Sequence, residues 1–168
     1  MKEFAIGLAR PQSSDDWREA RRLIEEYAAS LNVDLCFQNF AHELEHLAEE
    51  YGPPGGAFLL AVENGVNVGC VGLRKLPQGA GEMKRLYTVP AVRGRGVGRL
   101  LAQAIVGEAR RLGYPAVVLD TLPFMKEAQG LYASLGFEPT AAYRYNPIDG
   151  TAYLELDLRK GNRVSRSD

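Results

Sequence analysis

The stretch EMKRLYTVPAVRGRGVGRLLAQA, residues 82–104, carries the strongest signal of fold in this chain. Its pattern predicts a strand that ends at Val89, then a glycine-rich turn, then a helix. Glycines leave the backbone N–H groups of such a turn uncovered, and the helix start adds a partial positive charge. Arg93, Arg95 and Arg99 add full positive charges at a helix end that favours negative ones. A bound anion would resolve this conflict, and a pyrophosphate would suit the turn best.

Two well-known phosphate-binding patterns do not match this turn. A P-loop requires Gly-Lys followed by Ser or Thr, and the turn has no such run. The dinucleotide-binding fingerprint requires a third glycine at the position that Arg99 occupies. A plain glycine-rich turn with solvated arginines stays open as the simple alternative. If the turn binds a ligand, we expect a phosphate-bearing molecule of a different kind.

The segments on either side of this stretch predict one α+β domain without internal repeats. Asn64-Gly65 joins two expected strands, since this dipeptide favours the tight turn of a hairpin. Gly113 and Gly136 follow two apolar helical patterns and are expected to end those helices. The expected strands cover residues 2–8, 57–63, 66–74, 82–89, 116–120, 137–145 and 151–158, and the expected helices begin near Ser13, Phe40, Val97 and Met125.

Size and composition fit a single globular domain. The chain has 168 residues, of which 46% are hydrophobic and 24% are charged, so we expect one domain over residues 1–160 and a polar tail over 161–168. The net charge of −1 and the pI of about 6.2 argue against a nucleic-acid partner. We expect a cytoplasmic protein with no membrane partner and with reduced Cys36 and Cys70, since the sequence has neither a secretory signal nor an apolar run of roughly 20 residues.

Two motifs carry a resemblance to a known family. Residues 93–98, Arg-Gly-Arg-Gly-Val-Gly, resemble the R/Q-x-x-G-x-G/A signature of the GNAT superfamily of N-acetyltransferases. Residues 128–137, AQGLYASLGF, are similar to the late A-x-x-L-Y-x-x-x-G-F pattern of that superfamily. The resemblance implies an α+β fold with α/β/α layers, in which about four helices flank a mixed, strongly twisted sheet of about seven strands.

The resemblance also implies a cofactor site and no metal. In the family, amides of the glycine-rich turn bind the pyrophosphate of acetyl-coenzyme A (acetyl-CoA), which is a co-substrate. The strand before the turn binds the pantetheine arm at a splay between two central strands. The expected cofactor-binding residues are Leu86, Tyr87, Thr88, Val89, Arg93, Gly94, Arg95, Gly96, Val97, Gly98, Arg99, Thr121 and Ala128.

Two further residues match catalytic positions of the family. Tyr132 stands where many members carry the tyrosine that protonates the departing thiolate, although a core aromatic is the simple alternative. Glu82 matches the general base of histone-type members, which takes a proton from the attacking amine. The alternatives are a surface carboxylate paired with Lys84, or a chain of waters in place of a dedicated base.

The function implied is direct transfer of an acetyl group from acetyl-CoA to a primary amine. A small-molecule acceptor is favoured, while a peptide amine or an amino acid stays open, and a homodimer is possible because dimers are common in the family. A non-catalytic acyl-CoA sensor on the same fold is the rival from another class. The expected acceptor-binding residues are Phe37, Phe40, Tyr51 and Tyr143, with Tyr145 and Asn146 near them.

A separate motif raises the possibility of a zinc hydrolase. His42, Glu43 and His46 follow the H-E-x-x-H order, in which two histidines one helical turn apart bind zinc and the glutamate activates water. However, no third ligand is signalled after His46, and charged Glu45 stands between the histidines. We therefore expect a helix with a solvated charged face and no metal.

Overall fold

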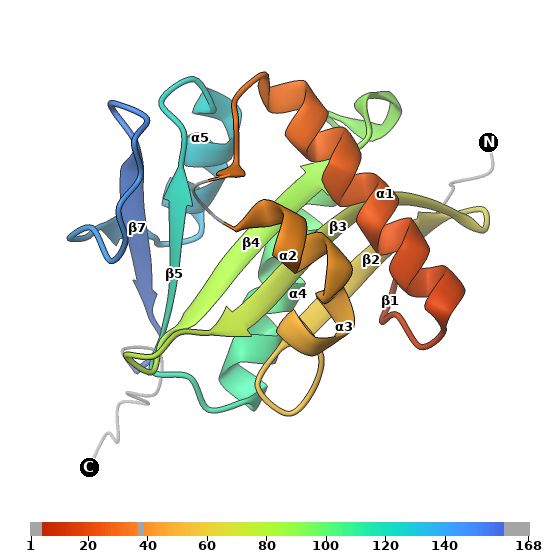
Figure 1. Ribbon diagram of the computed structural model, residues 1–168, viewed down its shortest axis with the longest axis horizontal. Helices are drawn as coiled ribbons and strands as arrows, with labels where there is room; N and C mark the ends of the chain where they lie inside the picture. Colours follow the sequence, from red (N-terminus) through yellow and green to blue (C-terminus); the bar gives the residue numbers. More distant parts are fainter. Residues whose placement is uncertain (1–4, 37–38, 160–168) are drawn as a thin grey trace, which may run out of the picture.

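The computed structural model describes residues 5–36 and 39–159 of the chain. Helices cover both faces of a twisted seven-stranded sheet, which gives three layers (Figure 1). The strand order is β1-β2-β3-β4-β5-β7-β6. β4 and β5 run parallel, while the other neighbouring strands run antiparallel, so the sheet is mixed. The expected α+β fold class is confirmed.

Most strands follow the sequence pattern closely. Of the strand expected over 2–8, residues 2–4 lie outside the described residues, and the observed β1 begins at Gly7. The Asn64-Gly65 hairpin is confirmed, and both residues have the positive φ (51° and 75°) that such a turn requires. The strand expected over 137–145 is wrong beyond its start, because Tyr143 and Arg144 turn inward to Glu82. The strands are β1 Gly7–Ala9, β2 Ala57–Glu63, β3 Val66–Lys75, β4 Gly81–Thr88, β5 Ala116–Thr121, β6 Glu138–Pro139 and β7 Ala152–Asp157.

The helices begin where the sequence places them, but one of them is split. At the start of α1, the Ser13 hydroxyl accepts a hydrogen bond from the Asp16 amide, and the Asp16 carboxylate accepts one from the Ser13 amide. The helix expected from Phe40 breaks at His46 into two short helices, so the described residues contain five α-helices where about four were expected. They are α1 Ser14–Leu31, α2 Phe40–Glu45, α3 Leu47–Glu50, α4 Val97–Arg111 and α5 Lys126–Ser134, and a 3₁₀ turn spans Pro90–Val92.

Each face of the sheet has its own apolar core. On one face, α4 packs Leu101 and Ile105 against β3 and β5, and α5 adds Tyr132. On the other face, α1 packs Leu23 and Ile24 against β2 and β3, and α3 adds its own apolar side. β4 therefore lies at the centre of the sheet with helices over both faces (Figure 1). None of the helices in the described ranges combines the length and the hydropathy that a bilayer crossing needs.

Candidate functional site

The centre of the sheet is open where β4 and β5 separate. These two strands pair only through Gly81 with Val117 and Glu82 with Val118, at their first residues. A bulge in β4 helps to separate them. From Lys84 to Tyr87, β4 advances three residues while its partner β3 covers only two, between Gly72 and Cys70. Arg85, inside the bulge, has a positive φ of 61°. Beyond the first pairs, the edge of β4 that faces β5 is free of ladder partners from β5.

A groove and a deeper cavity meet at this splay. The groove has a volume of about 540 Å³ and runs from the glycine-rich turn along the end of β4 to the start of α5. The cavity has a volume of about 40 Å³ and lies between β4 and β5, beneath the end of α1. Both are bounded by the same residues where they join, namely Tyr27, Leu31, Leu86 and Met125. The two spaces therefore adjoin each other, and together they are called the passage.

The glycine-rich turn presents backbone amides to the groove. Gly94 and Gly96 have positive φ angles of 77° and 80°, which other residues adopt only with strain. Gly96 is the N-cap of α4, and no side chain forms a capping hydrogen bond there, within the chain as described. The first N–H groups of α4 thus keep their hydrogen-bonding capacity for a ligand.

The arginines of the turn do not all meet at this helix end. Arg93 lines the groove, where its Nε donates to the Thr88 carbonyl oxygen at 3.2 Å and its guanidinium lies 5.8 Å from the centre of the Tyr87 ring. Arg95 forms an ion pair with Glu63 at the end of β2. Arg99 donates to the Ser134 hydroxyl of α5 at 2.7 Å. The charge conflict expected from the sequence is thus partly resolved by protein groups.

Most residues expected to bind the cofactor surround this passage. Thr121 lines the cavity, and its hydroxyl is buried without a hydrogen-bond partner among the described residues. Val89, Arg95 and Arg99 are not among the residues that line the groove. Those that do line it are Leu86, Tyr87, Thr88, Arg93, Gly94, Gly96, Val97, Gly98 and Ala128.

Tyr132 takes part in both the core and the cavity. Its ring packs against Phe137 with 5.7 Å between the ring centres, and its side chain also lines the cavity. Burial raises the pKa of the Tyr132 hydroxyl, so it stays protonated at neutral pH. A protonated hydroxyl at this place can donate a hydrogen bond or a proton into the cavity.

Glu82 is enclosed by cations, so the surface-carboxylate alternative is wrong. Its side chain is 0% exposed, and its oxygens accept from Arg74 Nε at 2.9 Å, Arg144 Nη2 at 2.7 Å and the Tyr143 hydroxyl at 2.7 Å. Burial alone would raise its pKa, but the charges of Lys84, Arg144 and Arg74 lower it below the usual value. Glu82 is not among the residues that line the cavity.

The H-E-x-x-H motif has a structural role in this fold. Glu43 is 2% exposed and accepts two hydrogen bonds from Arg85, at 2.8 and 3.0 Å, so the expectation of a fully solvated charged face was wrong for this residue. The His42 and His46 rings stack with 4.1 Å between their centres. In residues 5–36 and 39–159, no three His, Cys, Asp or Glu side chains are grouped so as to hold a metal ion.

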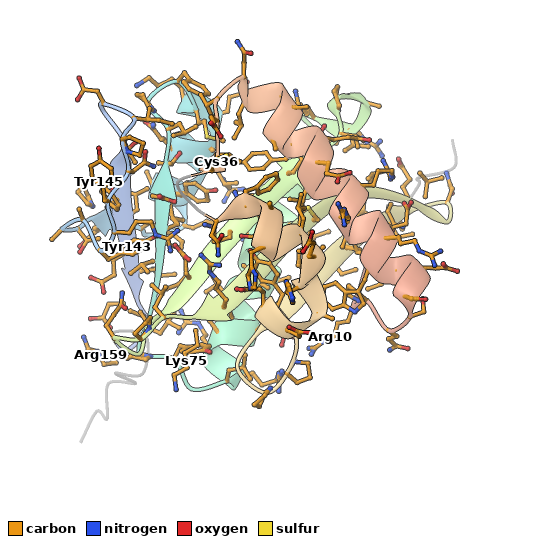
Figure 2. All side chains as sticks on the ribbon, viewed as in Figure 1. Arg10, Cys36, Lys75, Tyr143, Tyr145 and Arg159 are labelled. Carbon is orange, nitrogen blue, oxygen red and sulfur yellow. The ribbon has the colours of Figure 1, made fainter. Side chains whose placement is uncertain are left out.

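The residues expected to bind the acceptor do not lie together. Phe37 lies outside the described residues, and Phe40 stacks beneath the Arg85 guanidinium at 5.1 Å. Tyr51 is 1% exposed and packs in the core, because Gly72 leaves room for its ring. Tyr143 lies beside β7, where its ring contacts Tyr153 and its hydroxyl donates a hydrogen bond to Glu82. Tyr145 is largely exposed (Figure 2).

Three charged residues of the cavity were not among the expected site residues. They are Lys84, Arg85 and Asp120. Asp120 accepts a hydrogen bond from the Asn146 side chain at 3.4 Å, which brings the segment before β7 to the cavity. Its place beside Thr121 at the end of a buried strand is the sequence signal that could have revealed it. Lys84 and Arg85 carried no such signal, since both stand in the middle of a strand.

Comparisons with known proteins agree with this geometry. The model of the acetyltransferase (GNAT) family matches residues 17–137. An uncharacterised N-acetyltransferase of Schizosaccharomyces pombe is 41% identical over 162 residues, which are 95% of this chain and 99% of the relative. Another from Escherichia coli is 33% identical over 124 residues, or 72% of this chain and 73% of the relative.

Solved structures share the fold at lower sequence identity. A GNAT-family acetyltransferase from Staphylococcus aureus superposes with a TM-score of 0.75 at 20% identity, covering 92% of this chain and 99% of that one. A Salmonella typhimurium protein solved with its cofactor acetyl-CoA has a TM-score of 0.64 at 23% identity, covering 92% and 94%. Family match, relatives and fold agree, and the chain belongs to the acetyltransferase (GNAT) family.

Proposed function

We propose that this protein transfers the acetyl group of acetyl-CoA to the primary amine of a small molecule. The observation that carries the proposal is that the groove at the start of α4 adjoins the cavity between β4 and β5, with four lining residues in common. The passage has an anion-binding end and an inner end where hydroxyl groups are buried. This polarity matches a long molecule with a pyrophosphate at one part and a reactive acyl group at its tip.

The residues present fit acetyl-CoA at both ends. At the outer end, the amides of residues 94–98, the helix dipole of α4 and Arg93 favour the pyrophosphate. Along the groove, β4 offers backbone groups that β5 does not pair, and these suit the amides of the pantetheine arm. At the inner end, the buried Thr121 hydroxyl lacks a partner within the described ranges and would gain one from the ligand.

The chain's own groups would act at the inner end of the passage. Bound acetyl-CoA supplies an acetyl group activated as a thioester. Tyr132, which burial keeps protonated, would give a proton to the sulfur as the acetyl group leaves it. The role of Glu82 as general base stays a prediction, and its enclosure by Arg74 and Arg144 does not favour it.

The shape of the cavity favours a small acceptor. A volume of about 40 Å³ takes only the amine-bearing end of a molecule. Apolar Leu35 and Leu122 line it together with polar Asp120 and Asn146. An acidic side chain beside the reacting position attracts a protonated amine.

Binding and turnover test the proposal separately. Titration calorimetry should show acetyl-CoA binding that weakens at least tenfold in Arg93→Ala, because a charge at the groove is lost. Arg18→Ala is the control, since Arg18 is exposed on α1 and pairs only with Asp15 among the described residues. Absence of binding at millimolar acetyl-CoA would contradict the proposed site.

Turnover is followed as thiol release with a panel of diamines, aromatic amines and amino acids. Tyr132→Phe should keep acetyl-CoA affinity and lower kcat on the order of 10²-fold, as expected for loss of a general acid. An unchanged kcat would refute the role of Tyr132. Tight acetyl-CoA binding without turnover of any amine would favour the alternative function, a non-catalytic acyl-CoA sensor.

A further inference from the structure

Lys84 lies at the inner end of the passage, in the middle of the central strand. Its side chain is 5% exposed, and it lines the cavity together with Tyr132 and Thr121. The β4 bulge explains this position. Met83 and Leu86 pack toward the α4 core, so Lys84 and Arg85 between them both face the side of α2. A strand without the bulge would turn one of these two cations into the apolar core.

The surroundings of Lys84 contain both signs of charge. Burial, together with the positive charge of Arg85, lowers the pKa of Lys84 to about 7. Burial thus favours the uncharged form of the Lys84 amine, which can accept a proton. The charged groups that act on Lys84 are Glu82 and Arg85 of β4, Arg74 of β3, Glu43 of α2 and Arg144 before β7. Asp120 of β5, Tyr27 of α1 and Tyr132 of α5 line the same cavity.

Glu82 and Lys84 thus differ in both access and ionisation. Glu82 is held as an anion by two arginines, outside the cavity lining, with a pKa below the usual value. Such a carboxylate binds a proton poorly. Lys84, in contrast, is among the residues that line the cavity. A base works best when its pKa lies near the operating pH, and buried lysines are known to be tuned in this way.

We propose that Lys84, and not Glu82, is the group that accepts the proton of the acceptor amine in acetyl transfer. This inference rests on the proposed function. The acceptor first loses its extra proton to solvent and attacks as the neutral amine. The amine nitrogen forms a bond to the acetyl carbon, and the bond between that carbon and sulfur breaks. One proton passes from nitrogen to the Lys84 amine, and one passes from the Tyr132 hydroxyl to sulfur. Return of the proton from Lys84 to Tyr132 through water restores both residues, so the reaction is balanced.

The ionisation of Lys84 is testable without an acceptor. The chain has five lysines, Lys2, Lys75, Lys84, Lys126 and Lys160, so protein labelled with carbon-13 lysine gives few signals. Lys84→Met assigns the Lys84 signal by its disappearance. We expect this signal to titrate near pH 7, in the free protein and with acetyl-CoA bound. A midpoint above about 10, the value of an ordinary lysine, would overturn the inference.

The catalytic role is tested by the pH profile of kcat at saturating amine and acetyl-CoA. Wild-type kcat should rise with pH through about 7, because the base must lose its proton before it can act. Lys84→Met should lower kcat on the order of 10²-fold or more and remove this rise. Lys84→Arg should do the same, since a guanidinium keeps the positive charge but does not deprotonate.

Controls distinguish this role from a purely structural one. All variants should retain acetyl-CoA affinity in calorimetry, which shows that the passage is intact. Lys75→Met changes an exposed lysine at the end of β3 and should leave the profile unchanged (Figure 2). Lys84→Arg with kcat within threefold of wild type would overturn the inference while leaving the proposed function in place. Wild-type protein that acetylates no amine would remove both.

Discussion

The Glu43→Gln substitution tests what the H-E-x-x-H motif contributes to this protein. Glu43 is 2% exposed, and both its oxygens accept from Arg85, which is itself 6% exposed. The glutamine has almost the same size, so the change removes one charge and little packing. Arg85 would then be a buried cation without its main counterion. Breaking a buried pair in this way costs roughly 3–5 kcal/mol of unfolding free energy.

Thermal and urea unfolding measure this loss. For a domain of this size, each kcal/mol corresponds to about 2–4 °C, so we expect Tm to fall by roughly 6–20 °C. The double variant Glu43→Leu/Arg85→Met replaces both charges with apolar groups and should recover most of the stability. A double variant less stable than Glu43→Gln would contradict this explanation, as would a loss below about 1 kcal/mol in Glu43→Gln alone.

Matched variants on the same helix separate the ion pair from zinc binding. Glu45→Gln and His42→Ala change exposed residues of α2 and should alter stability by no more than about 0.5 kcal/mol. A zinc site would give the opposite order, with His42→Ala as damaging as Glu43→Gln and with zinc lost from the purified protein. Unfolding curves and metal analysis of these three variants therefore decide between the two roles.

Two further predictions concern the glycine-rich turn and the buried lysine. Gly96→Ala should lower the free energy of unfolding by about 1–2 kcal/mol and weaken acetyl-CoA binding. Gly96 has a φ of 80°, and no atom lies near the position of an added methyl group, so the loss comes from backbone strain. Gly107→Ala, inside α4 with equally open space, should instead gain about 0.5–1 kcal/mol and leave binding unchanged in calorimetry. Between about pH 7 and 9.5, wild-type stability should rise with pH by up to about 1.4 kcal/mol per unit, because the unfolded chain holds a proton on Lys84 that the folded chain has lost. Lys84→Met should flatten this slope in urea unfolding, and equal slopes for the two proteins would refute it.

Much of the fold is encoded in local patterns. Asn64-Gly65 specifies a hairpin, Ser13 with Asp16 caps α1, and the glycines after α4 and α5 end those helices, each through contacts within a few residues. The glycine-rich turn before α4 is equally local, because positive φ angles and free helix amides depend on the turn itself. For this reason the α+β class and the turn with its free helix amides followed from the sequence alone.

The chemistry at the inner end of the passage depended on the tertiary structure. Arg74 and Arg144 enclose Glu82 and hold it ionised. One extra residue in β4 sets the direction in which the Lys84 side chain points. The partners of Arg95 and Arg99 are likewise remote in sequence. Charge interactions act through space and strengthen on burial, so a pattern of neighbouring letters cannot report them. The sequence by itself determined where a cofactor could bind, while the packing of β4 against its neighbours decided which side chain is placed to move a proton.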